Sequence, residues 1–328
     1  MYLGIDLGGT KTAIGIVDEY GNITQRHAFP SVANDFVVYC KLLQENLDSF
    51  IKEHNLTYNN FKAVGVGCAG QIEIKTGTIF HSPNLNWTNA PLGQTLAEIF
   101  KEAKVTIDND VRAATLGEYL FGLENRPSIY ANIFLGTGIG SGIIINDRIL
   151  RGYSNSAGEI GLTSIDFNGP RHSSGNRGVY EYYGSGTALE RFGRELAQSQ
   201  LEEYPRKLGG QRLCDRVESI EIITGKLVGD LAISGNPDAI KLVQNVAQNI
   251  GVGIANVINF LNPEVITYGG GLSEIGPILI DTMLSTVEER AISTAVKNTV
   301  IQKANLGNDA GIIGSAFLHR VDKNGVIS

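Results

Sequence analysis

The N-terminal stretch of the chain alternates short apolar runs with a glycine-rich polar turn. The apolar run 2–7 carries one carboxylate, Asp6, and the chain turns through Gly8 and Gly9 before a second apolar run, 13–17. Apolar runs of this length, bounded by turn residues, predict two β-strands joined by a tight turn. Glycines let a backbone approach a bulky anion, and the N–H groups of the turn can face that anion.

The side chains of this turn are polar. Thr10, Lys11 and Thr12 place hydroxyls and a cation on it. Asp6 is suited to hold a hydrated Mg²⁺ beside phosphate oxygens. An ordinary hairpin with a polar turn explains the same residues, so this stretch alone does not separate the two interpretations.

The same pattern recurs twice along the chain. The stretch 133–142 is an apolar run followed by glycines and a hydroxyl. It continues into three isoleucines at 143–145, the polar pair 146–147 and then Arg148, Ile149 and Leu150. A third glycine turn within 265–273 follows another apolar run. Two related hairpins predict a duplicated fold with a phosphate chain held between its halves.

Two common phosphate-binding motifs are excluded by their context. Gly4 and Gly9 have the spacing of a Walker loop, but Thr10 precedes Lys11 and a strand follows where that loop needs a helix. A dinucleotide fingerprint also needs a helix directly after its glycines. Gly142 is followed by three isoleucines, which indicate a strand.

The remaining periodic segments alternate between strands and helices. Apolar residues at helical spacing predict helices over 36–51, 91–100, 111–119, 186–196, 236–260 and 310–318. Asn34 or Asp35 is expected to cap the first of these. Buried strands are predicted at 61–70 and 105–108, and a hairpin at 72–80. The segment 150–183 is polar and irregular, which at this length is typical of a functional loop.

Asp110 stands at a predicted strand-to-helix junction. An N-cap carboxylate is the ordinary explanation for an aspartate in this position. The alternative is a general base that faces a ligand, with Asn109 beside it as a hydrogen-bonding partner. The second interpretation accounts for both residues and for their place between two glycine hairpins.

Composition limits the function classes. A length of 328 residues suggests two domains. The net charge of −7 argues against a nucleic-acid surface, and no uncharged apolar run is long enough to span a bilayer. An odd set of scattered cysteines, Cys40, Cys68 and Cys214, suits reduced thiols in a cytoplasm. The first strand begins at Tyr2, so we expect no signal peptide and a cytoplasmic protein.

Taken together, the motifs resemble those of one known family. They occur in a fixed order, and they are Asp6–Thr12, Asn109–Asp110, Leu135–Gly138, Gly158–Gly161, Gly175–Gly178 with Glu181, and Gly269–Leu272. The chain resembles, over essentially its whole length, the ROK family (repressors, uncharacterised reading frames and sugar kinases) within the actin-like ATPase superfamily.

The resemblance implies an α/β fold. Two ribonuclease-H-like (actin-like ATPase) domains, each a mixed sheet flanked by helices, are expected around a central cleft. The smaller N-terminal domain is expected over 1–122 and the larger C-terminal domain over 123–309. A C-terminal helix at about 310–322 is expected to pack back on the first domain.

The resemblance also implies roles for individual residues. Asp110 matches the catalytic base, and Asp6 matches the carboxylate that faces Mg²⁺ through water. The expected sugar-binding residues are Gly70, Asn84, Asn109, Asp110, Glu159 and Glu181. The expected ATP-binding residues, with adenosine against the last of them, are Asp6, Gly8, Gly9, Thr10, Lys11, Gly136, Thr137, Gly138, Gly269, Gly270 and Gly271.

One departure from the family concerns metal binding. Family members usually carry a zinc site built from a histidine and three cysteines, whose positions are occupied here by Leu162, His172, Ser174 and Val179. A structural zinc site needs about four nitrogen or sulfur ligands. We therefore expect no zinc. The family's histidine often touches the sugar as well, so Leu162 leaves the identity of the sugar open.

The resulting hypothesis is an ATP-dependent hexose kinase, with glucose converted to glucose 6-phosphate as the favoured reaction. Alternative substrates are fructose, mannose, N-acetylmannosamine and N-acetylglucosamine. A catalytically degenerate sugar-binding protein and a sugar-responsive transcription regulator are the competing functions. The expected partners are the sugar and ATP, with Mg²⁺, and neither nucleic acid nor membrane. The resemblance further suggests a homodimer, or a tetramer.

Overall fold

The computed structural model describes residues 1–207 and 209–328. The chain forms two compact units. Unit 1 comprises residues 1–130, 142–158 and 304–328, and unit 2 comprises 131–141 and 159–303. The predicted domain boundary between residues 122 and 123 stays a prediction.

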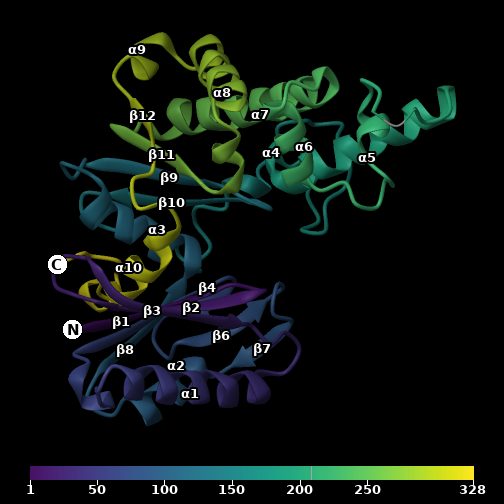
Figure 1. The fold of residues 1–328 in the computed structure, drawn as a ribbon. Helices are drawn as coiled ribbons and strands as arrows, with labels where there is room; N and C mark the ends of the chain where they lie inside the picture. The colour runs from purple at the N-terminus through teal and green to yellow at the C-terminus, as the bar shows by residue number, and fades with distance from the viewer. Residues whose placement is uncertain (208) are drawn as a thin grey trace. The chain divides into compact units, whose positions relative to one another are not determined.

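Unit 1 is built on a five-stranded mixed sheet (Figure 1). The strand order is β3-β2-β1-β4-β8, and the strands are β1 (Tyr2–Leu7), β2 (Lys11–Val17), β3 (Ile23–Pro30), β4 (Ala63–Cys68) and β8 (Lys104–Asn109). The first three strands pair antiparallel, whereas β1, β4 and β8 run parallel. The predicted first hairpin is confirmed, because β1 and β2 are joined by the turn at Gly8 and Gly9.

The register of the three parallel strands aligns their carboxyl ends. Leu7 pairs with Cys68, and Cys68 pairs with Asn109. The residues that follow these strands therefore emerge at one edge of the sheet. In open α/β sheets, this edge is where ligands bind.

The two faces of this sheet differ in side-chain size. Alternate residues of β1 and β4 belong to the apolar core that includes α1, and they are Leu3, Ile5, Leu7, Val64, Val66 and Cys68. Helices α1 (Phe36–Glu53) and α2 (Leu92–Ile99) lie on that side in Figure 1, with α3 (Asp110–Gly117) and α10 (Ala310–Ala316) on the other. Gly4 and Gly65 face α10. Their missing side chains let the helix backbone approach the strands directly.

Local signals account for the helix and hairpin positions in this unit. Asp35, one of the two predicted caps, accepts a hydrogen bond from the N–H of Val38 and begins α1. The predicted hairpin is present as β5 (Gln71–Glu73) and β6 (Thr78–Ser82). A third strand, β7 (Trp87–Ala90), extends it to a small antiparallel sheet.

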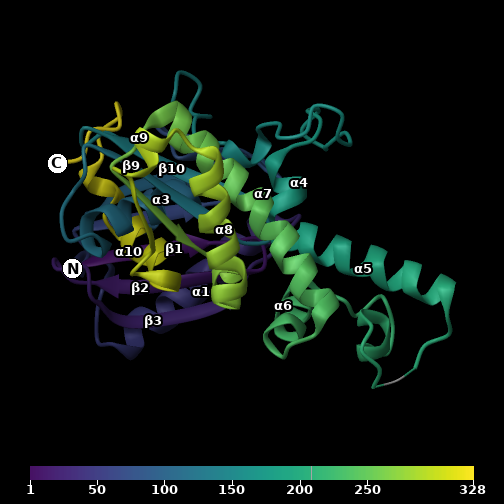
Figure 2. The ribbon, with the colours of Figure 1, turned by 90° about the horizontal axis from the view of Figure 1, so that it is seen from above.

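Unit 2 contains most of a four-stranded sheet of order β10-β9-β11-β12. Its strands are β9 (Ile129–Leu135), β10 (Ile139–Ile145), β11 (Val265–Gly269) and β12 (Val300–Lys303). The helices are α4 (Tyr180–Gly184), α5 (Gly186–Glu203), α6 (Gly225–Ile233), α7 (Pro237–Leu261), α8 (Pro277–Arg290) and α9 (Ser293–Val296). Figure 2 shows α7 and α8 running alongside each other.

The second glycine hairpin is also present. β9 and β10 flank the turn at 136–138. Beyond the polar pair 146–147, isolated bridges join Ile149 to Ile144 and Arg148 to Val326. In both sheets, a hairpin is followed by parallel strands, as the predicted duplication requires.

Among the described residues, no helix combines the length and the apolar character that a bilayer crossing requires.

The close packing of α10 on the sheet leads to a stability prediction. A Cβ on Gly65 would lie 1.7 Å from the carbonyl oxygen of Ser315. Because both partners are backbone, we expect Gly65→Ala to lower the free energy of unfolding by about 2–3 kcal/mol. Urea denaturation measures this loss. Gly271→Ala is the control, since a Cβ there meets nothing within 4 Å, and equal midpoints for the two variants would contradict the prediction.

Candidate active site

The predicted site residues of unit 1 gather at the carboxyl edge of β1, β4 and β8. Asp6 is the penultimate residue of β1, and Asp110 is the first residue of α3, directly after β8. A Cβ on Gly67 of β4 would lie 3.2 Å from the Cα of Asp110. The fold therefore brings together carboxylates that are 104 positions apart in the sequence.

Asn109, and not Asp110, caps α3. The Oδ1 atom of Asn109 accepts hydrogen bonds from the N–H groups of Val111 and Arg112 at 3.0 and 3.2 Å. The N-cap interpretation of Asp110 is therefore wrong. Asp110 lies one residue further on, where its Oδ1 accepts a bond from the N–H of Val111 at 2.9 Å. Capping uses the Oδ1 atom of Asn109, and one N–H of its Nδ2 donates to the carbonyl oxygen of Gly70, so the second N–H of Nδ2 remains to donate to a ligand.

Gly70 and Asn84 lie near these residues in unit 1. The Nδ2 atom of Asn109 is 3.4 Å from the carbonyl oxygen of Gly70. Gly70 has a φ of 141°, and a Cβ there would lie 2.5 Å from the carbonyl oxygen of His81, so only glycine fits. Asn84 lies against the first glycine turn, since a Cβ on Gly9 would be 2.9 Å from the Cβ of Asn84.

The first glycine turn is held by Ser31, the residue directly after β3. The Ser31 hydroxyl donates to the carbonyl oxygen of Gly8 at 2.7 Å, and its N–H donates to the carbonyl oxygen of Thr10 at 3.0 Å. The turn is closed by a bond from the N–H of Gly8 to the carbonyl oxygen of Lys11. Ser31 therefore sets the shape of the predicted phosphate turn, although no sequence motif indicates it.

The Asp6 carboxylate is largely buried and lies near a second carboxylate, that of Asp110. Burial first, and then the carboxylate of Asp110, raise the pKa of Asp6 to about 6, while Lys11 opposes the shift. Burial and the same two carboxylates raise the pKa of the Cys68 thiol well above its ordinary value. Two neighbouring carboxylates in a partly desolvated site fit a hard divalent cation such as Mg²⁺, which prefers oxygen ligands.

In unit 2, the second glycine turn is bonded to the start of α5. The N–H of Gly186 donates to the carbonyl oxygen of Gly136 at 2.8 Å. Both the N–H and the hydroxyl of Thr187 donate to the carbonyl oxygen of Thr137, at 3.2 and 2.9 Å. The start of α5 therefore orients the turn, and Gly186 and Thr187 are site residues that the sequence motifs did not indicate.

The second and third glycine turns line one pocket of about 650 Å³. The pocket also receives Glu190 from α5 and Lys226 from α6. Gly271 lines it with no atom within 4 Å of the place where a Cβ would stand. The volume lies in the range of small-ligand sites. Three of the predicted ATP residues, Gly136, Thr137 and Gly271, therefore line one pocket, and their role in binding ATP stays a prediction.

Gly270 shows why this third turn needs glycine. Its φ is 96°, and a Cβ there would lie 2.7 Å from the carbonyl oxygen of Leu135 in the neighbouring strand. The hydroxyl of Ser273 donates to the carbonyl oxygen of Gly270 at 2.7 Å. The turn after Gly269 is therefore tightly packed against β9, while Gly271 is left open toward the pocket.

Glu181 is held by the second glycine turn. Its Oε2 accepts a hydrogen bond from the N–H of Ile139 at 2.7 Å, and a Cβ on Gly138 would lie 2.2 Å from the same oxygen. Its Oε1 lies 3.9 Å from the Nε2 atom of His172. Glu159 is exposed and begins the short helix Ile160–Leu162. Both carboxylates belong to unit 2.

The loop at the family's zinc positions is held by other contacts. The Nδ2 atom of Asn176 donates to the carbonyl oxygen of Leu162 at 2.9 Å, and the hydroxyl of Tyr183 donates to Asp166 at 2.7 Å. His172 has Ser174 as its neighbour, with Nδ1 and Oγ 3.0 Å apart. Val179 is fully buried. Across residues 1–207 and 209–328, no group of three or more His, Cys, Asp or Glu side chains could hold a metal ion.

Comparison with known proteins identifies the relatives. A glucokinase of Halalkalibacterium halodurans is 32% identical over 325 residues, which are 98% of this chain and 96% of that protein. A xylose repressor of Caldicellulosiruptor bescii is 29% identical over 313 residues, which are 95% of this chain and 76% of the repressor.

A solved structure agrees over nearly the whole chain. A ROK family glucokinase from Streptomyces griseus, in complex with glucose and AMPPNP, has a TM-score of 0.80 and 30% identity and covers 97% of this chain and 98% of its own. The predicted α/β class with two actin-like domains is thereby confirmed. Residues 2–321 match the ROK family. Because this match spans almost the entire sequence, the chain belongs to the ROK family.

Proposed function

We propose that this protein is an ATP-dependent sugar kinase that converts glucose to glucose 6-phosphate. The observation that carries the proposal is the meeting of Asp6, Asn109 and Asp110 at the carboxyl edge of one parallel sheet. The similarity to glucokinases over almost the whole chain supports it. Magnesium dependence, a homodimeric assembly and a cytoplasmic location are further parts of the proposal.

Asp110 is the proposed general base. As the sugar oxygen attacks the γ-phosphorus and the bond to the leaving ADP oxygen breaks, the hydroxyl proton passes to the Asp110 carboxylate. A sugar hydroxyl is a weak acid, so removing its proton in the transition state accelerates transfer by about 10²–10⁴-fold. Asn109 donates through Nδ2 and orients the sugar, while its Oδ1 keeps α3 in place.

The nucleotide is proposed to use the glycine turns. The N–H groups of Gly8 and Gly136 close the two turns by donating to the carbonyl oxygens of Lys11 and Gly138. The N–H groups of Gly9 to Lys11 and of Thr137 and Gly138 would therefore be the ones to bind phosphate oxygens, and Gly269 to Gly271 would contact adenosine. Asp6 would hold Mg²⁺ through a water molecule. The metal, when bound, neutralises charge on the phosphate oxygens during transfer. The side chain of Lys11 adds a second positive charge at the first turn.

The sugar contacts are proposed to include Gly70, Asn84, Glu159 and Glu181. Glu181 has one oxygen engaged by the N–H of Ile139, so its other oxygen is the proposed acceptor for a sugar hydroxyl. Leu162 removes one hydrogen-bonding group from this environment. Fructose, mannose and the two N-acetylated amino sugars are therefore the alternative substrates to test beside glucose.

The base role leads to a kinetic prediction. Asp110→Asn keeps the shape of the side chain but cannot take a proton, so we expect kcat to fall about 10²–10⁴-fold with sugar binding retained. Coupled ADP release over the sugar panel measures kcat, and calorimetry measures sugar binding. Asp48→Asn, an exposed aspartate bonded to Tyr58, is the control and should keep wild-type rates. Turnover by Asp110→Asn at the wild-type rate would refute the base role, and sugar binding without turnover in wild type would identify a degenerate binding protein.

The raised pKa of Asp6 leads to a stability prediction. Its folded-state pKa of about 6 exceeds the ordinary value of 3.8, so the folded protein binds more protons between these pH values than the unfolded chain does. The contribution of Asp6 to the free energy of unfolding therefore falls as pH rises through this range. Above pH 6 the ionised group is destabilising by up to about 3 kcal/mol. We expect Asp6→Asn to melt several degrees above wild type at pH 8 without Mg²⁺ and nucleotide, yet to lose kinase activity.

The measurement is thermal unfolding of both proteins from pH 4 to 8. The difference in melting temperature should be small near pH 4 and should grow up to about pH 6. A variant that melts at or below the wild-type temperature at pH 8 would show that the ionised Asp6 carboxylate does not destabilise the folded protein.

The substitutions at Leu162, His172, Ser174 and Val179 lead to a metal prediction. We expect protein purified without added metal to contain no stoichiometric zinc, because this donor set lacks the four nitrogen or sulfur ligands of a structural site. Elemental analysis of the purified protein tests this. A zinc-selective chelator should leave the melting temperature unchanged, whereas one zinc ion per chain would overturn the prediction.

A further inference from the structure

A cluster of buried charged side chains is centred on Asp108, two residues before the proposed base, Asp110. Asp108 is fully buried, and Arg112 and Arg151 are only 4% and 8% exposed. Asp108 Oδ1 is 2.9 Å from Arg112 Nε, and Asp108 Oδ2 is 2.6 Å from Arg151 Nη2 and 3.1 Å from Arg151 Nε. Both oxygens of one carboxylate are therefore held by two guanidinium groups from different directions.

The cluster is bonded to the backbone where β8 ends and α3 begins, at Asn109 and Asp110. Asp108 immediately precedes Asn109, and its Oδ1 accepts a hydrogen bond from the Asn109 N–H at 2.8 Å. Arg112 lies in the first turn of α3, four residues after Asp108. The ion pair therefore ties the end of β8 to the start of α3, and Asn109 and Asp110 are the two residues directly after Asp108.

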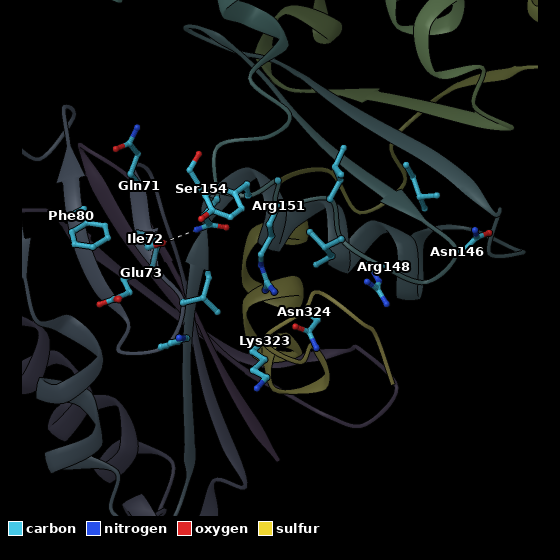
Figure 3. A pocket seen from close by; sticks show the side chains of 18 residues that line it. Gln71, Ile72, Glu73, Phe80, Asn146, Arg148, Arg151, Ser154, Lys323 and Asn324 are labelled. Atoms are coloured by element: carbon cyan, nitrogen blue, oxygen red, sulfur yellow. Dashed lines mark hydrogen bonds between the residues drawn. The ribbon is translucent and has the colours of Figure 1, made fainter.

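The other contacts of the two arginines reach two further residues of unit 1, and one of these, Asn155, is bonded to a third. Arg151 Nη1 donates to the carbonyl oxygen of Asp322 at 3.0 Å, and Arg112 Nη1 donates to that of Asn155 at 3.2 Å. The Nδ2 atom of Asn155 in turn donates to the carbonyl oxygen of Ile72 at 2.6 Å; Figure 3 draws this region. The segment 151–155 precedes Gly158 and Glu159 in the chain.

Stability alone is a poor reason for such an arrangement. Removing three charges from water costs several kcal/mol per ion, and well-packed apolar residues are often as stable as a buried ion pair. What the ionic contacts add is direction, because a guanidinium binds a carboxylate in a planar geometry with little freedom. Because the Asp108 carboxylate also accepts a bond from the N–H of Asn109, fixing the orientation of the carboxylate fixes the backbone at Asn109.

We propose that Asp108, Arg112 and Arg151 form a positioning triad that holds Asn109 and Asp110 in the orientation needed for proton transfer. The inference rests on the proposed kinase function. None of the three residues touches the reacting atoms in this scheme. They act through the junction between β8 and α3, so disturbing them should lower kcat more than it changes nucleotide binding.

A second ion pair in the chain supplies a matched control. In unit 2, Arg212 contacts Asp215 through Nε at 3.0 Å and Nη2 at 2.8 Å, and Asp215 is 4% exposed. Arg212 uses the same two donor atoms as Arg151, although they reach both oxygens of Asp215 while those of Arg151 converge on Asp108 Oδ2, and the pair lies outside the proposed site. Arginine-to-lysine replacement keeps the charge and removes the fork in both pairs.

The first experiment compares Arg151→Lys with Arg212→Lys in the full-length protein. For Arg151→Lys, we expect kcat for glucose phosphorylation to fall about tenfold to a hundredfold, the scale of a small misplacement in an active site. The KM for ATP should stay within about twofold. Arg212→Lys should keep the wild-type kcat even where its melting temperature falls by a similar amount.

The second experiment uses chemical rescue. Arg151 also lines a pocket of about 1160 Å³ in unit 1, shown in Figure 3, so truncation would open a path from this pocket to Asp108. In Arg151→Ala, millimolar ethylguanidinium should restore kcat severalfold. Ethylammonium at the same concentration should restore little, because it carries the charge without the planar fork.

The outcomes separate this inference from the proposed function. If wild type is an active kinase and Arg151→Lys keeps its kcat, the positioning role is overturned and the kinase function stands. A folded Arg151→Ala variant whose low kcat ethylguanidinium does not raise also overturns it. If Arg151→Ala does not fold, the comparison of the two lysine variants decides. A wild-type protein that phosphorylates no sugar overturns both.

Discussion

The parallel register of β1, β4 and β8 is the constraint on which the proposed site depends. Because Leu7, Cys68 and Asn109 are paired across the sheet, the residues that follow them emerge at one edge. The first glycine turn, Gly70 and the pair Asn109–Asp110 come together for this reason. A slip of one residue in either pairing would turn every following side chain to the opposite face. The chemistry proposed for this protein is thus a consequence of strand alignment.

The two faces of that sheet have different surroundings: one contributes to the apolar core, and the other lies against α10. The face toward α1 is filled by branched apolar side chains, which supply the core. The face toward α10 is nearly bare, and a Cβ on Gly4 would lie 1.9 Å from the carbonyl oxygen of Ile312. This close approach brings the backbone of Gly311 against Asp6, because a Cβ on Gly311 would lie 2.7 Å from Asp6 Oδ2. Burial then raises the pKa of Asp6 to about 6. The close packing of α10 on the sheet and the raised pKa of the Asp6 carboxylate therefore have the same structural origin.

Several side chains of the site serve two purposes. Asn109 caps α3 with its amide oxygen and donates to the carbonyl oxygen of Gly70 with its amide nitrogen, the group proposed to reach the sugar. Glu181 anchors the second glycine turn with one oxygen. Asp108 contributes no atom to the proposed reaction, yet it bonds the backbone of Asn109. Such double use means that the binding groups are positioned by the same bonds that hold the secondary structure together. The loop at the family's zinc positions follows the same rule, with Tyr183 and Asn176 tethering it.

The sequence by itself determined the glycine turns, the strand-to-helix junction at Asp110 and the residue types of the site, because each depends on neighbours in the chain. Turn chemistry and hydrophobic periodicity are local properties, and the ordered motifs identified the family and with it the fold. Only the tertiary structure decided that Asn109 caps α3 and that Ser31 holds the first turn. It also decided that Thr187, Glu190 and Lys226 line the pocket proposed for the nucleotide. The same holds for Arg151, which meets Asp108 across 43 positions of sequence. These contacts join residues far apart in the chain, and no local pattern encodes which distant side chain will fill a given space. The packing of the folded chain decides which groups bond each other, because a buried polar group without a hydrogen-bond partner raises the free energy of the folded state.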